Sequence, residues 1–154
     1  MAHTEHKQSF LSKYVFSTDH KTIGAQYTIT GLFMAALGGF LAYVFRYNLA
    51  FPGENIPIFG QLAANQYNTF VTCHGMIMVF WVAMPILLAG FGNFLIPLMI
   101  GTDDMAFPKL NMLSYWTFLI SAIVLVASFF VPTGAFGGAW TMYPPLSVNG
   151  YVDP

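Results

Sequence analysis

Three long runs without a formal charge constrain this sequence more than any other feature. They cover residues 22–45, about 67–101 and about 110–131. A transmembrane α-helix needs about 20 predominantly apolar residues, so each run is long enough to cross a bilayer. The sequence therefore predicts a membrane protein.

The composition supports this prediction and decides the fold class. Of all residues, 56% are apolar and only 7% are charged, far from the average of soluble domains. Lipid leaves only helices or closed barrels as spanning structures, and these runs are too continuously apolar for barrel strands. We predict an all-α integral membrane bundle with transmembrane helices at about 22–46, 67–100 and 110–131, preceded by an N-terminal segment, 1–21. Pro85 should bend the second helix.

Charge and cysteine content narrow the functional classes. The formal net charge is −1 and the five basic residues form no run, so nothing indicates binding of nucleic acid. The single cysteine, Cys73, can form no internal disulfide, and we expect it to pack as a small apolar residue.

The basic residues are unevenly distributed around the three runs. Lys7, Lys13 and Lys21 precede the first run and Lys109 lies between the second and third, whereas Arg46 stands alone on the opposite side. The positive-inside rule therefore places the N-terminal segment on the cytoplasmic side or its equivalent. Because Lys13 interrupts the only apolar stretch of that segment, we expect no removable signal peptide.

Small residues recur in the first predicted helix. Gly31, Ala35 and Gly39 are spaced by four, which predicts a smooth stripe for close helix packing. At about 100° per residue, Arg46 falls about 20° from Gly39, so we expect its side chain on the same packed stripe. There it could extend to the headgroups, or it could meet an anionic edge of a cofactor.

His74 lies in the second predicted helix, in a stretch with no carboxylate or ammonium group. An ionisable side chain at such a place is a functional candidate, although it could also be a buried histidine that bridges two helices. Neutral imidazole is a good ligand for haem iron, and a low-spin haem needs two axial ligands. The other three histidines all precede the first helix, so a second ligand would have to come from outside this chain.

A second polar constellation lies where the second run ends. Asp104 stands in the connection to the third helix, and Asn93 and Asn111 lie on either side of it. A carboxylate with two nearby amides could take up a proton and hold a chain of water molecules. The simpler interpretation is that Asp104 caps a turn and that the amides pack between helices.

These residues occur in motifs that closely resemble the N-terminal part of subunit I of the haem–copper cytochrome oxidases. The similarity covers nearly everything from Phe16 onward. The motifs are Phe16-Ser-Thr-Asp-His-Lys-Thr-Ile-Gly24, Arg46 seven residues before Gly53, Thr72-x-His74-Gly-Met-Ile-Met, Gly90-Phe-Gly-Asn93-Phe-Leu-Ile-Pro-Leu-Met-Ile-Gly101, Asp104-Met-Ala-Phe-Pro-Lys-Leu-Asn111 and Gly138-Ala-Trp140-Thr-Met-Tyr143-Pro-Pro.

The resemblance implies a role for each candidate residue. His74 resembles one axial ligand of the low-spin haem, expected to be haem a, and Arg46 resembles the residue that hydrogen-bonds a peripheral group of that haem. Asp104 resembles the carboxylate at the mouth of the family's D proton channel, with Asn93 and Asn111 as its amide gate. Trp140 resembles a tryptophan near the haem propionates at the binuclear site.

The resemblance also implies an activity and partners. Members of the family reduce dioxygen to water with electrons from cytochrome c and pump protons. The expected partners are the remainder of subunit I, subunits II and III, cytochrome c and membrane lipid. The high-spin haem and copper of a complete subunit would have their ligands outside this chain. The family has about twelve spans, so three spans by themselves are not expected to reduce oxygen.

Two departures and two alternatives complete the sequence-based interpretation. Asn48 stands where many members carry a carboxylate for a peripheral sodium or calcium ion, which argues against that metal site here. The 15 residues before Phe16 favour a bacterial plasma membrane over the mitochondrial inner membrane. The alternatives are a quinol oxidase of the same superfamily and a non-catalytic membrane scaffold or transporter fragment.

Overall fold

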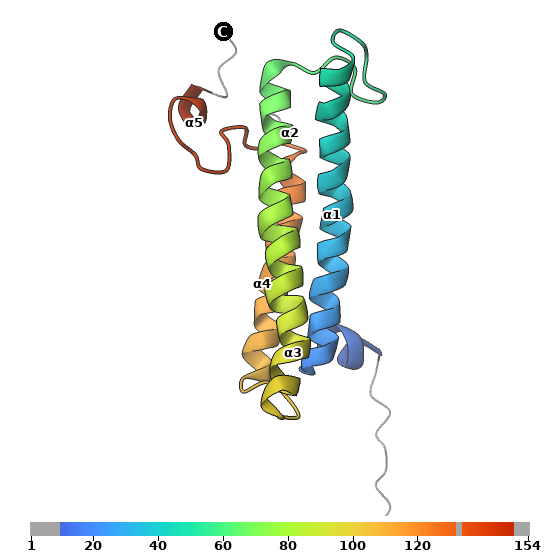
Figure 1. Ribbon diagram of the computed structural model, residues 1–154, viewed down its shortest axis with the longest axis vertical. Helices are drawn as coiled ribbons and strands as arrows, with labels where there is room; N and C mark the ends of the chain where they lie inside the picture. The colour runs from blue at the N-terminus through green and yellow to red at the C-terminus, as the bar shows by residue number, and fades with distance from the viewer. Residues whose placement is uncertain (1–9, 132–133, 150–154) are drawn as a thin grey trace, which may run out of the picture.

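A computed structural model of the chain describes residues 10–131 and 134–149. Three long helices lie side by side along one axis (Figure 1). The first is α1 (His20–Ala50), and the third is α4 (Pro108–Ser128). The second is continuous from Ala64 to Ile100 and consists of four pieces: α2 (Ala64–Met76), η2 (Ile77–Ala83), η3 (Pro85–Gly90) and α3 (Phe91–Ile100). Two short helices flank them: η1 (Leu11–Val15) and α5 (Leu146–Asn149).

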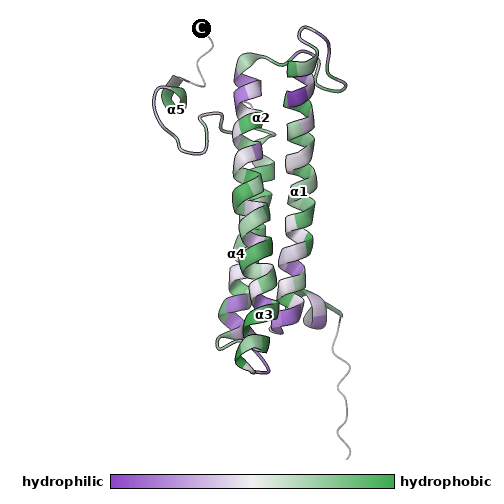
Figure 2. Ribbon diagram, in the orientation of Figure 1, coloured by the Kyte–Doolittle hydropathy of each residue, from purple (hydrophilic) through white to green (hydrophobic). Residues whose placement is uncertain are grey.

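The chain is an all-α, multi-pass membrane protein, as the sequence predicts. All three long helices have the length and apolar composition needed to cross a membrane. Hydrophobic residues predominate along the middle of the three helices, and hydrophilic residues are more frequent toward the two ends of the bundle (Figure 2). Most residues in the apolar windows of these helices are not buried inside the bundle, and such a largely apolar exterior is what a lipid environment requires.

The helices begin and end a few residues from their predicted limits. α1 starts at His20 because the Asp19 carboxylate accepts hydrogen bonds from the N–H and the hydroxyl of Thr22, both at 2.8 Å, and so caps the helix. The same helix continues four residues beyond Arg46 to Ala50, whereas α4 ends at Ser128. Residues 1–9 of the predicted N-terminal segment lie outside the described residues.

The second helix accommodates Pro85 by widening its turns. Met84 N–H bonds to the carbonyl of Val79, and Phe91 N–H bonds to that of Ile86, five residues back in each case. Proline lacks the N–H for an ordinary helical bond, and π-helical turns are a known response to such an interruption. Wide turns therefore lie on both sides of Pro85, where the sequence predicts a bend.

The glycine stripe on α1 differs from the predicted one. A Cβ at Gly31 would lie 2.6 Å from Ile86 Cγ1, and one at Gly24 would lie 3.0 Å from the Gly90 carbonyl oxygen. Gly38 is also buried, but Gly39 is exposed and a Cβ there would meet no described atom within 4 Å. The contact stripe is therefore Gly24, Gly31 and Gly38, spaced by seven, and the predicted spacing of four was wrong at Gly39.

The bundle has two distinct ends. The end with loop 51–63 is named the His74 end, and the end with loop 101–107 is named the Asp104 end (Figure 1). The larger buried cluster lies toward the His74 end and includes Met34, Leu41, Phe70 and Ile77. Cys73 belongs to this cluster and is 0% exposed, as expected of a small apolar residue.

Candidate functional site

His74 lies in the last turn of α2 and faces α1. Its Nδ1 atom is 2.9 Å from the backbone carbonyl oxygen of Gly38, and its ring meets the edge of the Phe45 ring with centroids 5.5 Å apart. The imidazole is half-buried. Two residues of α1 therefore hold the ring in one orientation.

The hydrogen bond to Gly38 decides which nitrogen of His74 is available. A carbonyl oxygen can only accept, so Nδ1 must carry the proton and donate it. In the neutral imidazole, Nε2 then keeps its lone pair. A histidine that binds a metal usually donates its other N–H to a carbonyl or carboxylate in this way, which fixes the tautomer and the ring orientation. The donor chemistry of His74 thus fits an iron ligand.

The glycine at position 38 makes this contact geometrically feasible. A Cβ at Gly38 would lie 2.9 Å from Met78 Sδ and 3.1 Å from Ile77 Cγ2, closer than side chains normally approach. Without a side chain, α1 can approach η2 closely, and the His74 ring can reach the backbone of α1. The sequence analysis named neither Gly38 nor Phe45 as a partner of His74.

Arg46 lies on an open face of the described chain. It directly follows Phe45, whose ring contacts His74, but its own side chain is exposed. The Arg46 guanidinium makes no hydrogen bond or ion pair with any other described residue. Arg46 does share a helix face with Gly39, as predicted. However, because that face is not the packed one, the expectation that Arg46 lies on a packed stripe was wrong for this chain.

Trp140 lies in the irregular segment after α4, beside the second helix. Trp140 is 59% exposed, and the centroid of its ring is 6.3 Å from that of Phe80 on η2. The preceding N–H, that of Ala139, donates to the Thr72 hydroxyl oxygen at 3.0 Å. The segment that carries Trp140 is thus attached to the helix that carries His74. The sequence analysis did not assign a role to Thr72.

At the Asp104 end, the structure brings Asn93 and Asn111 together. The side-chain amide of Asn111 donates to Asn93 Oδ1, and that of Asn93 donates to the Ala89 carbonyl at 2.6 Å. Asn93 is buried, and its backbone carbonyl accepts from Nδ1 of the buried His20 at 2.6 Å. The sequence analysis grouped the two amides with Asp104 but did not predict the hydrogen bond between them, and it missed the participation of His20.

Asp104 itself lies in the exposed connection between α3 and α4. One carboxylate oxygen accepts from the Met105 N–H at 2.7 Å, and the Asp104 carbonyl accepts from the Thr102 hydroxyl at 3.2 Å. Within the described chain the carboxylate makes no hydrogen bond to Asn93 or Asn111. It also does not cap α4, whose N-cap is Phe107. The carboxylate is therefore open to solvent, whereas Asn93 is buried and Asn111 is half-buried.

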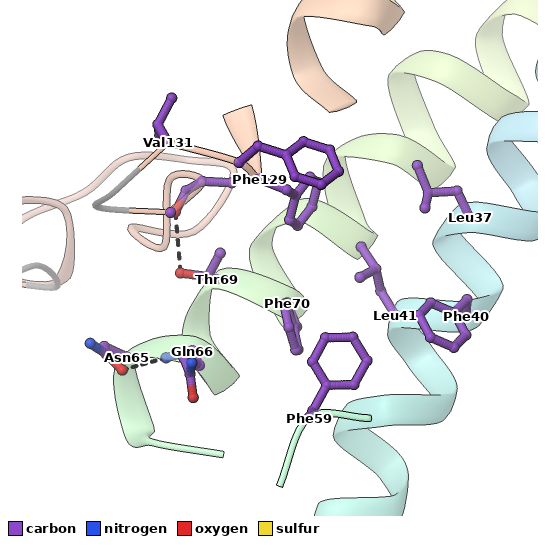
Figure 3. Close-up of a pocket in the computed structure, with 13 residues that line it drawn as sticks. Leu37, Phe40, Leu41, Phe59, Asn65, Gln66, Thr69, Phe70, Phe129 and Val131 are labelled. Carbon is purple, nitrogen blue, oxygen red and sulfur yellow. Dashed lines mark hydrogen bonds between the residues drawn. The ribbon is translucent and has the colours of Figure 1, made fainter. Parts of the chain in front are cut away.

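An apolar pocket of about 680 Å³ opens near the His74 end, between α1, α2 and the residues after α4 (Figure 3). Its walls carry aromatic rings that include Phe40, Phe59, Phe70 and Phe129. None of the described residues that line it is a predicted site residue. The candidate site is therefore not this cavity, but a set of side chains held on the surfaces of α1 and the second helix.

The arrangement separates two kinds of chemistry. The His74 end presents one nitrogen ligand in a fixed tautomer, while the Asp104 end presents a solvent-exposed carboxylate near two joined amides. Among the described residues there is no cluster of three or more His, Cys, Asp or Glu side chains that could hold a metal ion by itself. A metal at His74 would need additional ligands, such as those of a haem.

Comparison of the sequence with known protein families shows to which family the chain belongs. The family described as "Cytochrome C and Quinol oxidase polypeptide I" matches residues 22–153. The chain belongs to this family. The sequence-based resemblance to oxidase subunit I is thereby confirmed.

Individual relatives agree with this membership of the oxidase subunit I family. The chain is 46% identical over 143 residues to "Alternative cytochrome c oxidase subunit 1" of Bradyrhizobium diazoefficiens, which covers 93% of this chain and 24% of the relative. It is 42% identical to "Heme-copper oxidase subunit I+III" of Aeropyrum pernix, over 94% of this chain and 17% of the relative. It is 44% identical to "Cytochrome c oxidase subunit 1" of Thermostichus vulcanus, over 87% of this chain and 23% of the relative. The chain therefore spans about a quarter or less of the length of these relatives.

Proposed function

We propose that this chain forms the N-terminal part of the catalytic subunit of a terminal respiratory oxidase. In that assembly, dioxygen is reduced to water with electrons from cytochrome c, and protons are pumped across the membrane. The chain would supply one axial ligand of the low-spin haem and the mouth of a proton channel. The remainder of subunit I, with subunits II and III, would supply the second low-spin ligand, the high-spin haem and the copper.

The hydrogen bond between His74 and Gly38 carries this proposal. It commits Nδ1 to a backbone carbonyl and leaves Nε2 as the free ligand atom. A low-spin haem, taken to be haem a, accepts and passes on single electrons when it is bound. The role of the protein here is to hold the imidazole in one orientation with its proton on Nδ1. Gly38 and Phe45 do this from α1.

Arg46 and Trp140 would contact the edge of the same cofactor region. The Arg46 guanidinium is exposed and has no anionic partner among the described residues, so it is available for a peripheral oxygen of the haem. Such a hydrogen bond would tune the haem potential. Trp140 would donate its indole N–H near the haem propionates at the binuclear site.

Asp104, Asn93 and Asn111 would form the proton mouth. The exposed carboxylate can exchange protons with solvent, and the amides can donate and accept hydrogen bonds to water without titrating. The Asn93–Asn111 contact joins α3 to α4, the two helices on either side of the connection that carries Asp104. The amide pair would therefore act as a gate behind the carboxylate.

The distribution of basic residues supports an orientation. Lys21 and Lys109 lie in the first turns of α1 and α4, at the Asp104 end, and Arg46 lies at the opposite end. The Asp104 end and the N-terminal segment would therefore lie on the cytoplasmic side, and the membrane would be a bacterial plasma membrane. Protons would then be taken up from the cytoplasm.

One alternative uses the same hydrogen bond differently. A non-catalytic membrane protein could employ His74 only to bridge α1 and α2 through Nδ1, with no use for Nε2.

A second alternative, a quinol oxidase, differs only in its electron donor, and the family description covers both donors. Assays of the assembled complex with each donor separate the two oxidases, whereas the low-spin haem separates both of them from the scaffold.

The test uses substitutions of His74 in the assembled complex. His74→Asn keeps an N–H donor that can reach the Gly38 carbonyl but removes the Nε2 ligand. We expect both His74→Asn and His74→Ala to abolish the low-spin haem band in the reduced-minus-oxidised spectrum. Cys73→Ser, which changes the neighbouring buried residue, serves as the control and should retain the band. An unchanged band in His74→Asn would reject His74 as the ligand.

A further inference from the structure

We propose that Thr72 is a positioning residue whose hydroxyl oxygen, by accepting the Ala139 N–H, fixes Trp140 on the helix that carries His74. The two atoms are 3.0 Å apart, and Thr72 is only 5% exposed. The proposal rests on the proposed function of Trp140 and adds a residue that controls where its ring lies.

The segment around Trp140 needs an external contact to hold its shape. Ala139 has φ +61° and Met142 has φ +56°, a left-handed conformation that residues with a Cβ avoid. The Met142 N–H bonds to the Ala139 carbonyl at 3.2 Å, which closes a turn around Trp140. Such a turn persists only where surrounding contacts favour it. The Thr72 hydroxyl oxygen is the contact made to the first of the two strained residues.

A neighbouring threonine holds the beginning of the same segment. The Thr69 hydroxyl donates to the Ala135 carbonyl at 3.2 Å, as Figure 3 shows. Gly137 lies so close that a Cβ there would be 2.8 Å from Thr69 Oγ1. Thr69 and Thr72 are three residues apart, so both hydroxyls lie on one face of α2. The segment is thus attached to that face at two points.

The helix therefore connects the tryptophan to the proposed haem ligand. His74 follows Thr72 by two residues, which turns its side chain about 200° away, toward α1. The Trp140 ring then meets Phe80, six residues further along the same rigid helix. The segment is held through the Ala139 N–H at Thr72 and through the Trp140 ring at Phe80. Its position relative to His74 is set by the geometry of one helix.

The experiment compares four single variants of the assembled oxidase and one double variant, which combines Thr72→Val with Trp140→Phe. Thr72→Val removes the acceptor but keeps the shape, whereas Thr72→Ser keeps the acceptor. Thr117→Val is the matched control, because the exposed Thr117 hydroxyl donates only to Leu113 in its own helix. Trp140→Phe reports what loss of the indole does. Each variant is measured for hydrogen exchange of the peptide that contains Ala139 and for the rate of electron transfer between the haems.

We expect Thr72→Val to accelerate exchange of the Ala139 amide by roughly tenfold, with Thr72→Ser and Thr117→Val like the wild type. Thr72→Val should also change electron transfer in the same direction as Trp140→Phe. The double variant should be no worse than Trp140→Phe alone. A still-protected amide in Thr72→Val would overturn the proposal, as would equal loss of protection in Thr72→Ser. If Trp140→Phe leaves electron transfer unchanged, the proposed role of Trp140 fails, and amide exchange still decides the role of Thr72.

Discussion

The two ends of the bundle hold their chemically important residues in opposite ways. At the His74 end, the imidazole is fixed by the backbone of α1, and the Trp140 segment is fixed by hydroxyls of α2. At the Asp104 end, the amides of Asn93 and Asn111 are tied together, but the Asp104 carboxylate lies in solvent and bonds only to its own loop.

The difference follows from what each end would have to do. A metal ligand works only if one atom is held in a constant position and protonation state, so its neighbours must restrict it. A group that takes up protons from water must stay accessible, and only the path behind it has to be ordered. The fixed imidazole at one end and the open carboxylate at the other thus suit two different tasks. The helix Ala64–Ile100 connects the two ends.

The largest effect is expected where the helices that connect the two ends are closest. Gly31→Ala places a Cβ 2.6 Å from Ile86 Cγ1, so the Ile86 side chain or α1 must shift, and we expect the free energy of unfolding to fall by about 1–3 kcal/mol. Gly39→Ala is the control: its Cβ meets open space, and alanine favours the helix by about 0.5–1 kcal/mol. Unfolding of the chain in mixed detergent micelles measures both. Equal shifts in the two variants would show that the seven-residue glycine stripe does not limit packing.

An intermediate effect is expected at the open carboxylate. Asp104→Asn should slow turnover and proton uptake of the assembled oxidase by about tenfold, equivalent to about 1.4 kcal/mol in the barrier, while the haem spectrum stays intact. Asp103→Asn changes the neighbouring exposed carboxylate and should have little effect. If both variants turn over alike, the Asp104 end is not the proton mouth, and the contrast between the two ends loses its functional meaning.

The smallest effect is expected at the cap of α1. Burial alone would raise the pKa of Asp19, but hydrogen bonds from the Thr22 N–H and hydroxyl, with the charges of His20 and Lys21, bring it below its ordinary 3.8. The folded state therefore favours the carboxylate, so its stabilisation is present above that value and is lost as the pH falls through the folded pKa.

Two variants of Asp19 separate the cap from its charge. Asp19→Ala should lower the free energy of unfolding by about 1 kcal/mol at neutral pH. Asp19→Asn still caps the helix but cannot titrate, so its stability should vary less with pH than that of the wild type below about pH 4. Thermal unfolding of the chain in micelles between pH 3 and pH 7 provides the measurement. Parallel pH profiles for the wild type and Asp19→Asn would contradict the lowered pKa.

The fold could be predicted from the sequence because only helices and closed barrels can span a lipid bilayer. Long uncharged runs specify helices, and all three were found within a few residues of their predicted limits. Family motifs around His74, Asn93 and Asn111 also located the candidate residues, and the amide pair was found in contact.

The contacts that orient the site could not be predicted in the same way. The partner of His74 is a backbone carbonyl, which every residue possesses, so no side-chain pattern reveals it. His20 and Thr72 likewise act on the backbone of distant segments. Only the glycine repeat could have been recognised in the sequence, because Gly24, Gly31 and Gly38 are spaced by seven. The sequence analysis instead predicted the contact stripe from the spacing of four that includes Gly39.

The glycine repeat also leaves an ambiguity of register that the two histidines remove. Sliding α1 by seven residues, about 10.5 Å, would bring another glycine of the repeat to each contact, so smooth packing alone permits several alignments. The bonds from His74 to Gly38 and from His20 to Asn93 are 18 residues apart on α1 and 19 apart on its neighbour. Only one antiparallel alignment satisfies both. Apolar packing tolerates several alignments of α1 with the second helix. The two specific polar contacts select one of them and so fix the register of the helical hairpin.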